Sequence, residues 1–264
     1  MIQLKTKDEI EELRRSALMV GDVLAEVSKH IRPGVATKRL DEIAEDYIRS
    51  FGAIPTFKGY CGYPASLCIS INDVVVHGIP GERVVKEGDI VSIDCGVTLN
   101  GWVGDSAYTF ALAGVEDEVM KLCRVTKESL YIGIEQCTVS KRLGDLGYHI
   151  QDYCQSFGYG VVRELCGHGV GRHMHEEPSV PNYGKRGNGT RFREGMTIAV
   201  EPMITLGKKD VLFEADQWTC RTVDHSPAAH YEHDIAITES GPDILSSFDK
   251  IEEAVKTNIN LEQI

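Results

Sequence analysis

The chain has 264 residues, of which 42% are hydrophobic and 26% charged, and its net charge is −12. This composition is typical of a folded globular protein and excludes a disordered or fibrous one. The acidic balance argues against nucleic-acid specificity, because such binders usually need a basic face. Every apolar run is shorter than the roughly 18 residues of a membrane span. Charges throughout the first ten residues argue against a signal peptide, so we expect a cytoplasmic protein.

Four amphipathic helices are predicted from apolar residues that recur every three or four positions. A capping box of Thr6 and Glu9 marks the start of the first helix, and a Pro-Gly pair ends it. The four apolar stripes cover Ile10–Ile31, Leu40–Phe51, Val119–Ile134 and Leu143–Phe157.

The chain repeats part of its own sequence at an offset of 106 or 107 residues. Asp46–Gly52 matches Asp152–Gly158 at five of seven positions, and Glu87–Asp94 parallels Glu194–Glu201. We interpret this as one α+β domain over 1–264, with pseudo-repeat halves of about 1–110 and 115–240. Each half would consist of two helices followed by antiparallel strands. No linker-like segment separates them.

Two aspartates flank the strongest turn signal in the sequence, Asn100-Gly101. A hairpin folded at this turn places residue 94 opposite 107 and residue 96 opposite 105. Asp94 and Asp105 then share one face as diagonal neighbours, roughly 7–8 Å apart at the backbone. Anions this close favour protonation unless a cation lies between them. The alternative is a pair of strand carboxylates that face water.

The second half supplies further candidate ligands. Glu201 precedes a proline that keeps its backbone extended, and Glu232 lies in a predicted strand over His230–Thr238. His168 lies in a glycine-rich segment whose backbone can approach a site closely. Four carboxylates and one imidazole suit Mn, Fe, Co or Zn ions and not a thiolate-rich structural zinc. Their charge nearly matches two divalent ions, which together could activate a hydroxide and polarise a carbonyl.

Other catalytic templates are absent from the sequence. There is no H-E-x-x-H, G-x-S-x-G, P-loop or proper G-x-G-x-x-G motif. The eight cysteines include no C-x-x-C pair, so we expect most to be reduced and buried. His77 and His175 lie near these candidates, but spacing alone does not separate a functional from a structural histidine.

At this point the chain resembles the methionine aminopeptidases, in their short bacterial type I form. Asp94, Asp105, His168, Glu201 and Glu232 look like the five metal ligands of that family. The flanking segments Asn72–Pro80, Cys166–Arg172, His175–Pro178, Val200–Met203 and Tyr231–His233 also fit.

The resemblance implies a pita-bread fold, with two pseudo-symmetric halves of paired helices around a central antiparallel sheet and a dinuclear metal site. The implied reaction removes the initiator methionine from nascent polypeptide N-termini when the second residue is small. The family is usually monomeric, and ribosome association is a family-level expectation. By analogy Asp105 and Glu232 would bridge two divalent metal ions (Co, Mn, Fe or Zn). Asp94 would bind one of them, and His168 and Glu201 the other.

The resemblance also assigns roles to residues around the metals. Glu201 would take and return a proton, His175 would stabilise the oxyanion, and His77 would contact the scissile nitrogen. Phe57 and Met174 depart from the bacterial pattern, in which Cys and Phe are common, but both are apolar. The methionine pocket would be lined by Tyr60, Tyr63, Cys68 and Trp218.

Two alternatives stay open on the sequence. One is another metallopeptidase of this fold, such as an X-Pro aminopeptidase. The other is a non-catalytic protein that uses the fold to bind RNA or protein, although the presence of all five ligands and both histidines argues against it.

Overall fold

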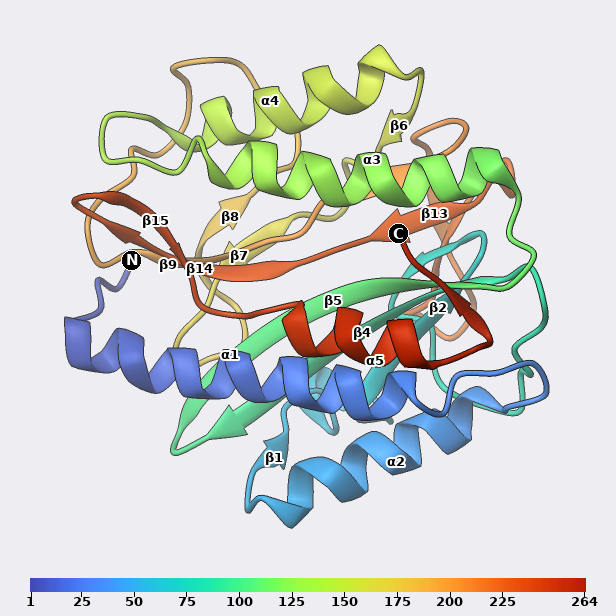
Figure 1. Ribbon diagram of the computed structural model, residues 1–264. Helices are drawn as coiled ribbons and strands as arrows, with labels where there is room; N and C mark the ends of the chain where they lie inside the picture. Colours follow the sequence, from blue (N-terminus) through green and yellow to red (C-terminus); the bar gives the residue numbers. More distant parts are fainter.

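The computed structural model describes all 264 residues, and its long helices lie on the two outer sides of the strands (Figure 1). One side carries α1 and α2 with the shorter α5, which packs along α1, and the other carries the paired α3 and α4. The helices are α1 (Lys7–Ser28), α2 (Thr37–Ser50), α3 (Asp117–Ile134), α4 (Leu143–Ser156) and α5 (Asp249–Thr257).

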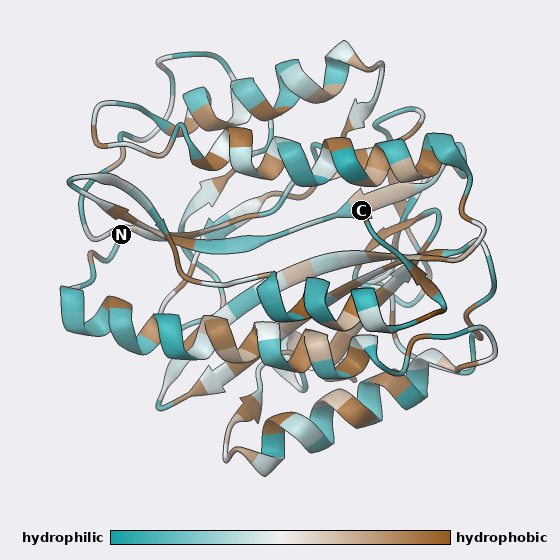
Figure 2. Ribbon diagram, in the orientation of Figure 1, coloured by the Kyte–Doolittle hydropathy of each residue, from teal (hydrophilic) through white to brown (hydrophobic).

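The four predicted helices are confirmed, with shifts at their C-terminal ends. The Thr6–Glu9 capping box begins α1, because the Thr6 hydroxyl accepts the Glu9 N–H while the Glu9 carboxylate accepts the Thr6 N–H. Phe51 and Phe157 belong to the predicted stripes but lie one residue beyond α2 and α4, where 62% and 38% of each residue is exposed. Apolar and polar residues recur in turn along each long helix (Figure 2). This pattern is expected when one face of a helix packs on strands and the opposite face meets water.

An antiparallel sheet around a long hairpin takes four strands from the first part of the chain and one from its C-terminal end. The register of that hairpin is the predicted one, with Asp94 opposite Ala107 and Gly96 opposite Asp105. This sheet has the order β1-β4-β5-β16, and β2 also pairs with β4. Its strands are β1 (Ile54–Pro55), β2 (Leu67–Ile71), β4 (Ile90–Leu99), β5 (Trp102–Leu112) and β16 (Leu261–Glu262).

The second part of the chain contributes a five-stranded antiparallel sheet and most of two smaller ones. The larger sheet has the order β15-β14-β9-β7-β8, and the smaller ones the orders β13-β10-β6 and β11-β12-β3. The larger sheet contains β7 (Gly167–Gly169), β8 (Glu176–Val180), β9 (Thr197–Val200), β14 (His233–Thr238) and β15 (Gly241–Ile244). The smaller ones contain β3 (Val74–Val76), β6 (Gly160–Val161), β10 (Met203–Thr205), β11 (Val211–Phe213), β12 (Cys220–Thr222) and β13 (Ala228–His230).

The predicted continuous strand over His230–Thr238 is wrong, because the structure breaks it around Glu232. β13 ends at His230 and pairs with β10, whereas β14 begins at His233 and pairs with β9. Between them the Glu232 N–H donates to the Ala107 carbonyl at 3.0 Å. Glu232 is therefore held where the chain passes from one sheet to another and against the β4–β5 hairpin.

The α1 helix lies directly on the hairpin next to Asp105. A Cβ at Gly104 would come within 2.2 Å of the Ala17 backbone nitrogen, so only glycine permits this approach. A single cluster of 53 buried hydrophobic residues draws on all five helices and both larger sheets. The division into two pseudo-repeat halves stays a prediction. None of the helices combines the length and apolar character needed to cross a membrane.

Candidate metal centre

The five predicted metal ligands come from separate elements and meet at one pocket. Asp94 and Asp105 lie on neighbouring strands of the hairpin, and His168 lies in β7. Glu201 directly follows β9, and Glu232 lies between β13 and β14. The pocket has an empty volume of about 580 Å³, and its lining includes every site residue named from the sequence: Tyr60, Tyr63, Cys68, His77, Asp94, Asp105, His168, His175, Glu201, Trp218 and Glu232.

The polar end of the pocket brings donor atoms within reach of a shared cation. One donor atom from each of Asp105, His168 and Glu232 lies within 4.8 Å of the other two. His168 Nε2 is 3.6 Å from Asp105 Oδ2 and 3.7 Å from Glu201 Oε1. The Nδ1 of the same ring lies 2.9 Å from the Gly169 carbonyl, which can accept a hydrogen bond from Nδ1–H and so leave the Nε2 lone pair free to bind a cation.

The carboxylates at this end are buried without enough hydrogen bonds. Asp105 and Glu232 are each 2% exposed, and one oxygen of Asp94, Asp105 and Glu232 has no hydrogen-bond partner. Buried polar atoms are normally satisfied, and buried charges are normally paired or bound to metal. These partnerless oxygens are the feature that a bound cation explains.

Burial also sets the protonation of the cluster. It raises the pKa of Asp94, Glu201 and Glu232 well above the usual range, and neighbouring carboxylates add to each shift. Burial raises the pKa of Asp105 to about 7. It lowers the pKa of His168, which favours the neutral imidazole that binds metal. The donor set therefore fits divalent metal ions, and all four carboxylates are ionised most readily when cations are present.

The other end of the pocket is apolar. The Tyr63 ring meets Trp218 edge to face at 5.1 Å, and its hydroxyl donates to the carbonyls of Leu67 or Gly78. Cys68 in β2 lies directly opposite Asp94 in β4. The Cys68 thiol therefore lies beside the carboxylates. Phe57 and Met174, at the two positions that depart from the expected pattern, are 6% and 5% exposed and pack in this wall.

Two histidines also line the pocket. The His175 Nδ1 is 2.8 Å from the Tyr60 hydroxyl, and its ring lies 4.3 Å from that of His168. His77 follows β3 with a φ of +59°, and its ring lies 6.3 Å from Trp218. Burial lowers the pKa of both His77 and His175 to about 4, so both rings are neutral near pH 7.

Sequence reasoning missed three buried side chains that surround the carboxylates. Asp234 accepts the Asp105 N–H at 2.7 Å, and its other oxygen has no partner. His230 places Nε2 3.7 Å from Glu201 Oε2, and Asn182 donates to the Glu201 carbonyl at 2.9 Å. His230 and Asp234 lie two residues before and two residues after Glu232, and this alternation could have indicated that both side chains belong to the site. Asn182 lies in an irregular segment that carries no such pattern.

Comparison with known proteins gives a consistent result. The model of metallopeptidase family M24 matches residues 11–239. A methionine aminopeptidase of Clostridium acetobutylicum is 50% identical over 247 residues, which cover 93% of this chain and 99% of the relative. Methionine aminopeptidase 1 of Bacillus subtilis is 48% identical over 246 residues, again 93% of this chain and 99% of the relative.

Solved structures resemble this chain over nearly its whole length. The crystal structure of methionine aminopeptidase from Rickettsia prowazekii superposes with a TM-score of 0.92 at 39% identity, covering 94% of this chain and 100% of that one. An Xaa-Pro dipeptidase from Bacillus anthracis superposes with a TM-score of 0.75 at 22% identity, covering 92% of this chain but 62% of that one. The second likeness concerns the fold alone.

Proposed function

The chain belongs to metallopeptidase family M24 and is a methionine aminopeptidase, and from this premise we propose that its pocket holds two divalent metal ions. Asp105 and Glu232 would bridge the ions, Asp94 would bind one, and His168 and Glu201 would bind the other. The observation that carries the proposal is the set of buried carboxylate oxygens without partners. The charges of four ionised carboxylates balance those of two divalent cations, which makes burial of the cluster tolerable.

The residues around the metals divide the chemistry between them. When bound, the ions supply Lewis-acid polarisation of the scissile carbonyl and activation of a water. Glu201 would hold a metal ion and is placed to take up the proton of the attacking water and pass it to the leaving amine. With the Tyr60 hydroxyl donating to Nδ1, neutral His175 carries its proton on Nε2 and donates it as a hydrogen bond to the developing oxyanion. His77 contacts the scissile nitrogen.

The apolar wall selects the side chain that is removed. Tyr63, Trp218 and Cys68 offer aromatic and sulfur contacts that suit a methionine thioether. We propose that the natural substrates are nascent polypeptides in the cytoplasm, with an initiator methionine followed by a small residue. The metallated enzyme would act on them as a monomer.

Turnover of matched peptides tests this function. The metallated enzyme should cleave a Met-Ala-Ser peptide and leave an Ala-Pro-Ser peptide intact, whereas a preference for the second would favour an X-Pro peptidase. His175→Ala should lower kcat roughly 10²- to 10³-fold with metal content unchanged, the usual cost of losing one oxyanion donor. His173→Ala is the matched control, because His173 is exposed and does not line the pocket. Loss of metal in His175→Ala would instead identify His175 as a ligand.

A further inference from the structure

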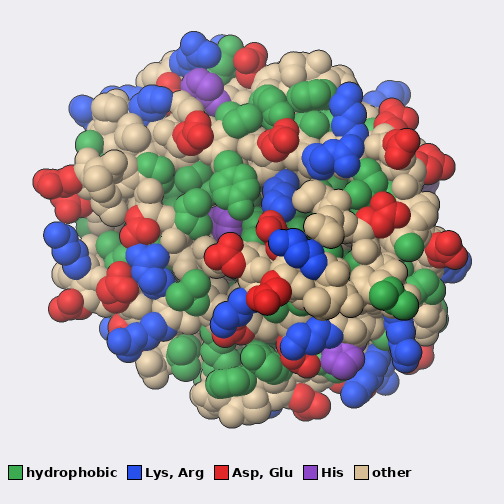
Figure 3. Space-filling view, in the orientation of Figure 1, with side chains coloured by type: hydrophobic (Ala, Val, Ile, Leu, Met, Phe, Trp, Pro, Cys, Tyr) green, Lys and Arg blue, Asp and Glu red, His purple; other side chains and the backbone are tan.

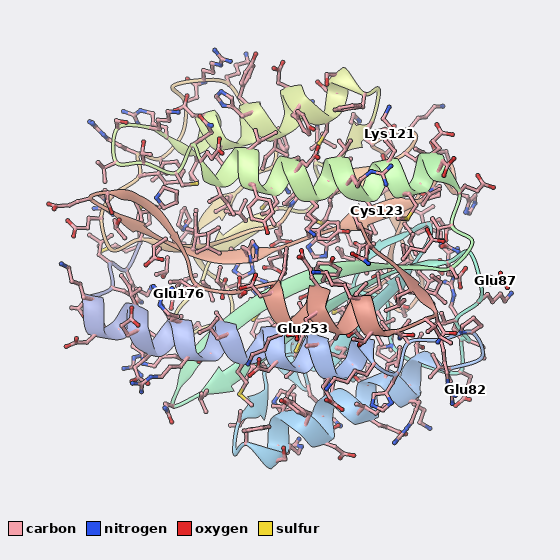
Figure 4. All side chains as sticks on the ribbon, in the orientation of Figure 1. Glu82, Glu87, Lys121, Cys123, Glu176 and Glu253 are labelled. Carbon is pink, nitrogen blue, oxygen red and sulfur yellow. The ribbon has the colours of Figure 1, made fainter.

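A buried ion pair lies outside the pocket, between the N-terminal segment and the start of β8. Lys5 Nζ donates to Glu176 Oε2, and the two side chains are only 5% and 6% exposed. Figure 4 labels Glu176 beside the N-terminal turns of α1. Lys5 precedes α1 and belongs to none of the motifs that mark the metal site. A buried ion pair of this kind is costly to form, so its presence calls for a reason.

The Glu176 carboxylate closes the turn that leads into β8. Its second oxygen, Oε1, accepts the backbone N–H groups of Arg172 at 3.0 Å and His173 at 3.3 Å. A Cβ at Gly171 would come within 2.4 Å of Glu176 Oε1 and 2.7 Å of Lys5 Cε, so the turn packs tightly on the ion pair. Lys5 and Glu176 thereby fix the backbone from Gly171 to Glu176.

This turn carries two residues of the pocket. Met174 packs in the apolar wall, and His175 lies directly before Glu176 with its ring against Tyr60 and His168. Because His175 is exposed and its ring has only the Tyr60 hydroxyl as a hydrogen-bond partner, its position depends mainly on the backbone that precedes β8. A shift of about 1 Å in a catalytic group can cost on the order of a hundredfold in rate.

The N-terminal segment is itself held where it meets α1. The Lys5 N–H donates to the Gly195 carbonyl at 2.7 Å, and a Cβ at Gly195 would approach the Lys5 carbonyl to 2.6 Å. The next residue, Thr6, is fixed by the capping box of α1. The backbone at Lys5 is therefore fixed, and it places the Lys5 ammonium group against Glu176.

We propose that Lys5 is a positioning residue, which holds the turn over 171–176 through Glu176 and so aligns His175 for the oxyanion. The inference rests on the proposed role of His175 in peptide hydrolysis. It gives Lys5 a part in aligning the site, although Lys5 does not line the pocket.

The test compares kcat, KM and metal content for the full-length metallated enzyme on a Met-Ala-Ser peptide. Lys5→Met removes the charge but keeps the side-chain length, and it should lower kcat roughly ten- to hundredfold with metal content unchanged. Adding Glu176→Gln to Lys5→Met should recover most of the lost kcat, because the amide oxygen still accepts both backbone N–H groups without leaving a buried charge. Lys7→Met is the matched control, since Lys7 is exposed in the first turn of α1 and should keep wild-type kcat.

The decisive comparison repeats Lys5→Met in a His175→Ala background. If Lys5 acts through His175, the second substitution should cause no further fall in kcat. An equal fall with or without His175, a Lys5→Met enzyme with wild-type kcat, or loss of metal in Lys5→Met would each overturn the proposal. If instead the proposed role of His175 is wrong, His175→Ala alone should leave kcat unchanged.

Discussion

Removing one buried carboxylate should stabilise the metal-free protein. Asp105 is 2% exposed, and one of its oxygens has no hydrogen-bond partner. Asp105→Asn keeps the shape of the side chain, removes its charge and offers N–H donors to the neighbouring carboxylates. Most substitutions of a buried polar residue destabilise a protein, so the sign of this prediction is specific to a cluster of uncompensated anions.

The magnitude follows from the pKa of Asp105. Burial raises it from 3.8 in the unfolded chain to about 7 in the folded protein. The folded state therefore binds more protons between these values, and its stability falls as the pH rises through this window. A shift of roughly three units corresponds to about 4 kcal/mol at pH 8. For a chain of this size that is a change of roughly 8 °C in Tm.

Thermal unfolding of chelator-treated protein at pH 5 and pH 8 measures the effect. Asp105→Asn should have the higher Tm at pH 8, a much smaller advantage at pH 5, and no peptidase activity with metal restored. Asp46→Asn is the control, because Asp46 is exposed on α2 and should leave Tm unchanged at both pH values. A metal-free Asp105→Asn protein no more stable than wild type at pH 8 would refute the electrostatic reasoning.

Three further predictions concern the surroundings of the site. Asp234→Asn keeps an acceptor for the Asp105 N–H but removes a buried charge, so metal titration should show weaker binding, and unchanged affinity would contradict this. Trp218→Ala opens the apolar wall and should raise KM for Met-Ala-Ser roughly tenfold with metal content unchanged, as peptide kinetics would show. Gly104→Ala should cost several kcal/mol in urea unfolding because its Cβ meets the α1 backbone, whereas Gly81→Ala, with open space around it, should not.

The part of the site formed by local pairing could be predicted from the sequence. The Asn100-Gly101 turn fixes the register of β4 and β5, and this register alone places Asp94 and Asp105 on one face. The helices were predictable for the same reason, since each apolar stripe reports a single buried face. Their last residues were not, because Phe51 continues the periodic pattern beyond the point where the α2 backbone ends.

Features that depend on contacts between distant segments could not be predicted in this way. The strand break at Glu232 arises because β13 and β14 pair with different partners, and alternation within the segment does not show this. Asp234 contacts the site because it accepts the N–H of Asp105, which lies 129 residues away in the sequence. The pairing of Lys5 with Glu176 joins an ordinary surface-type lysine to a carboxylate 171 residues later, and no local pattern links them.

Metal stoichiometry followed together with turnover tests the central claim most directly. Stepwise addition of Mn²⁺ or Co²⁺ to chelator-treated protein should end at two ions per chain, and cleavage of Met-Ala-Ser should appear with binding and vanish on renewed chelation. A metal-free protein that still cleaves the peptide, or a fully loaded one that does not, would contradict the account.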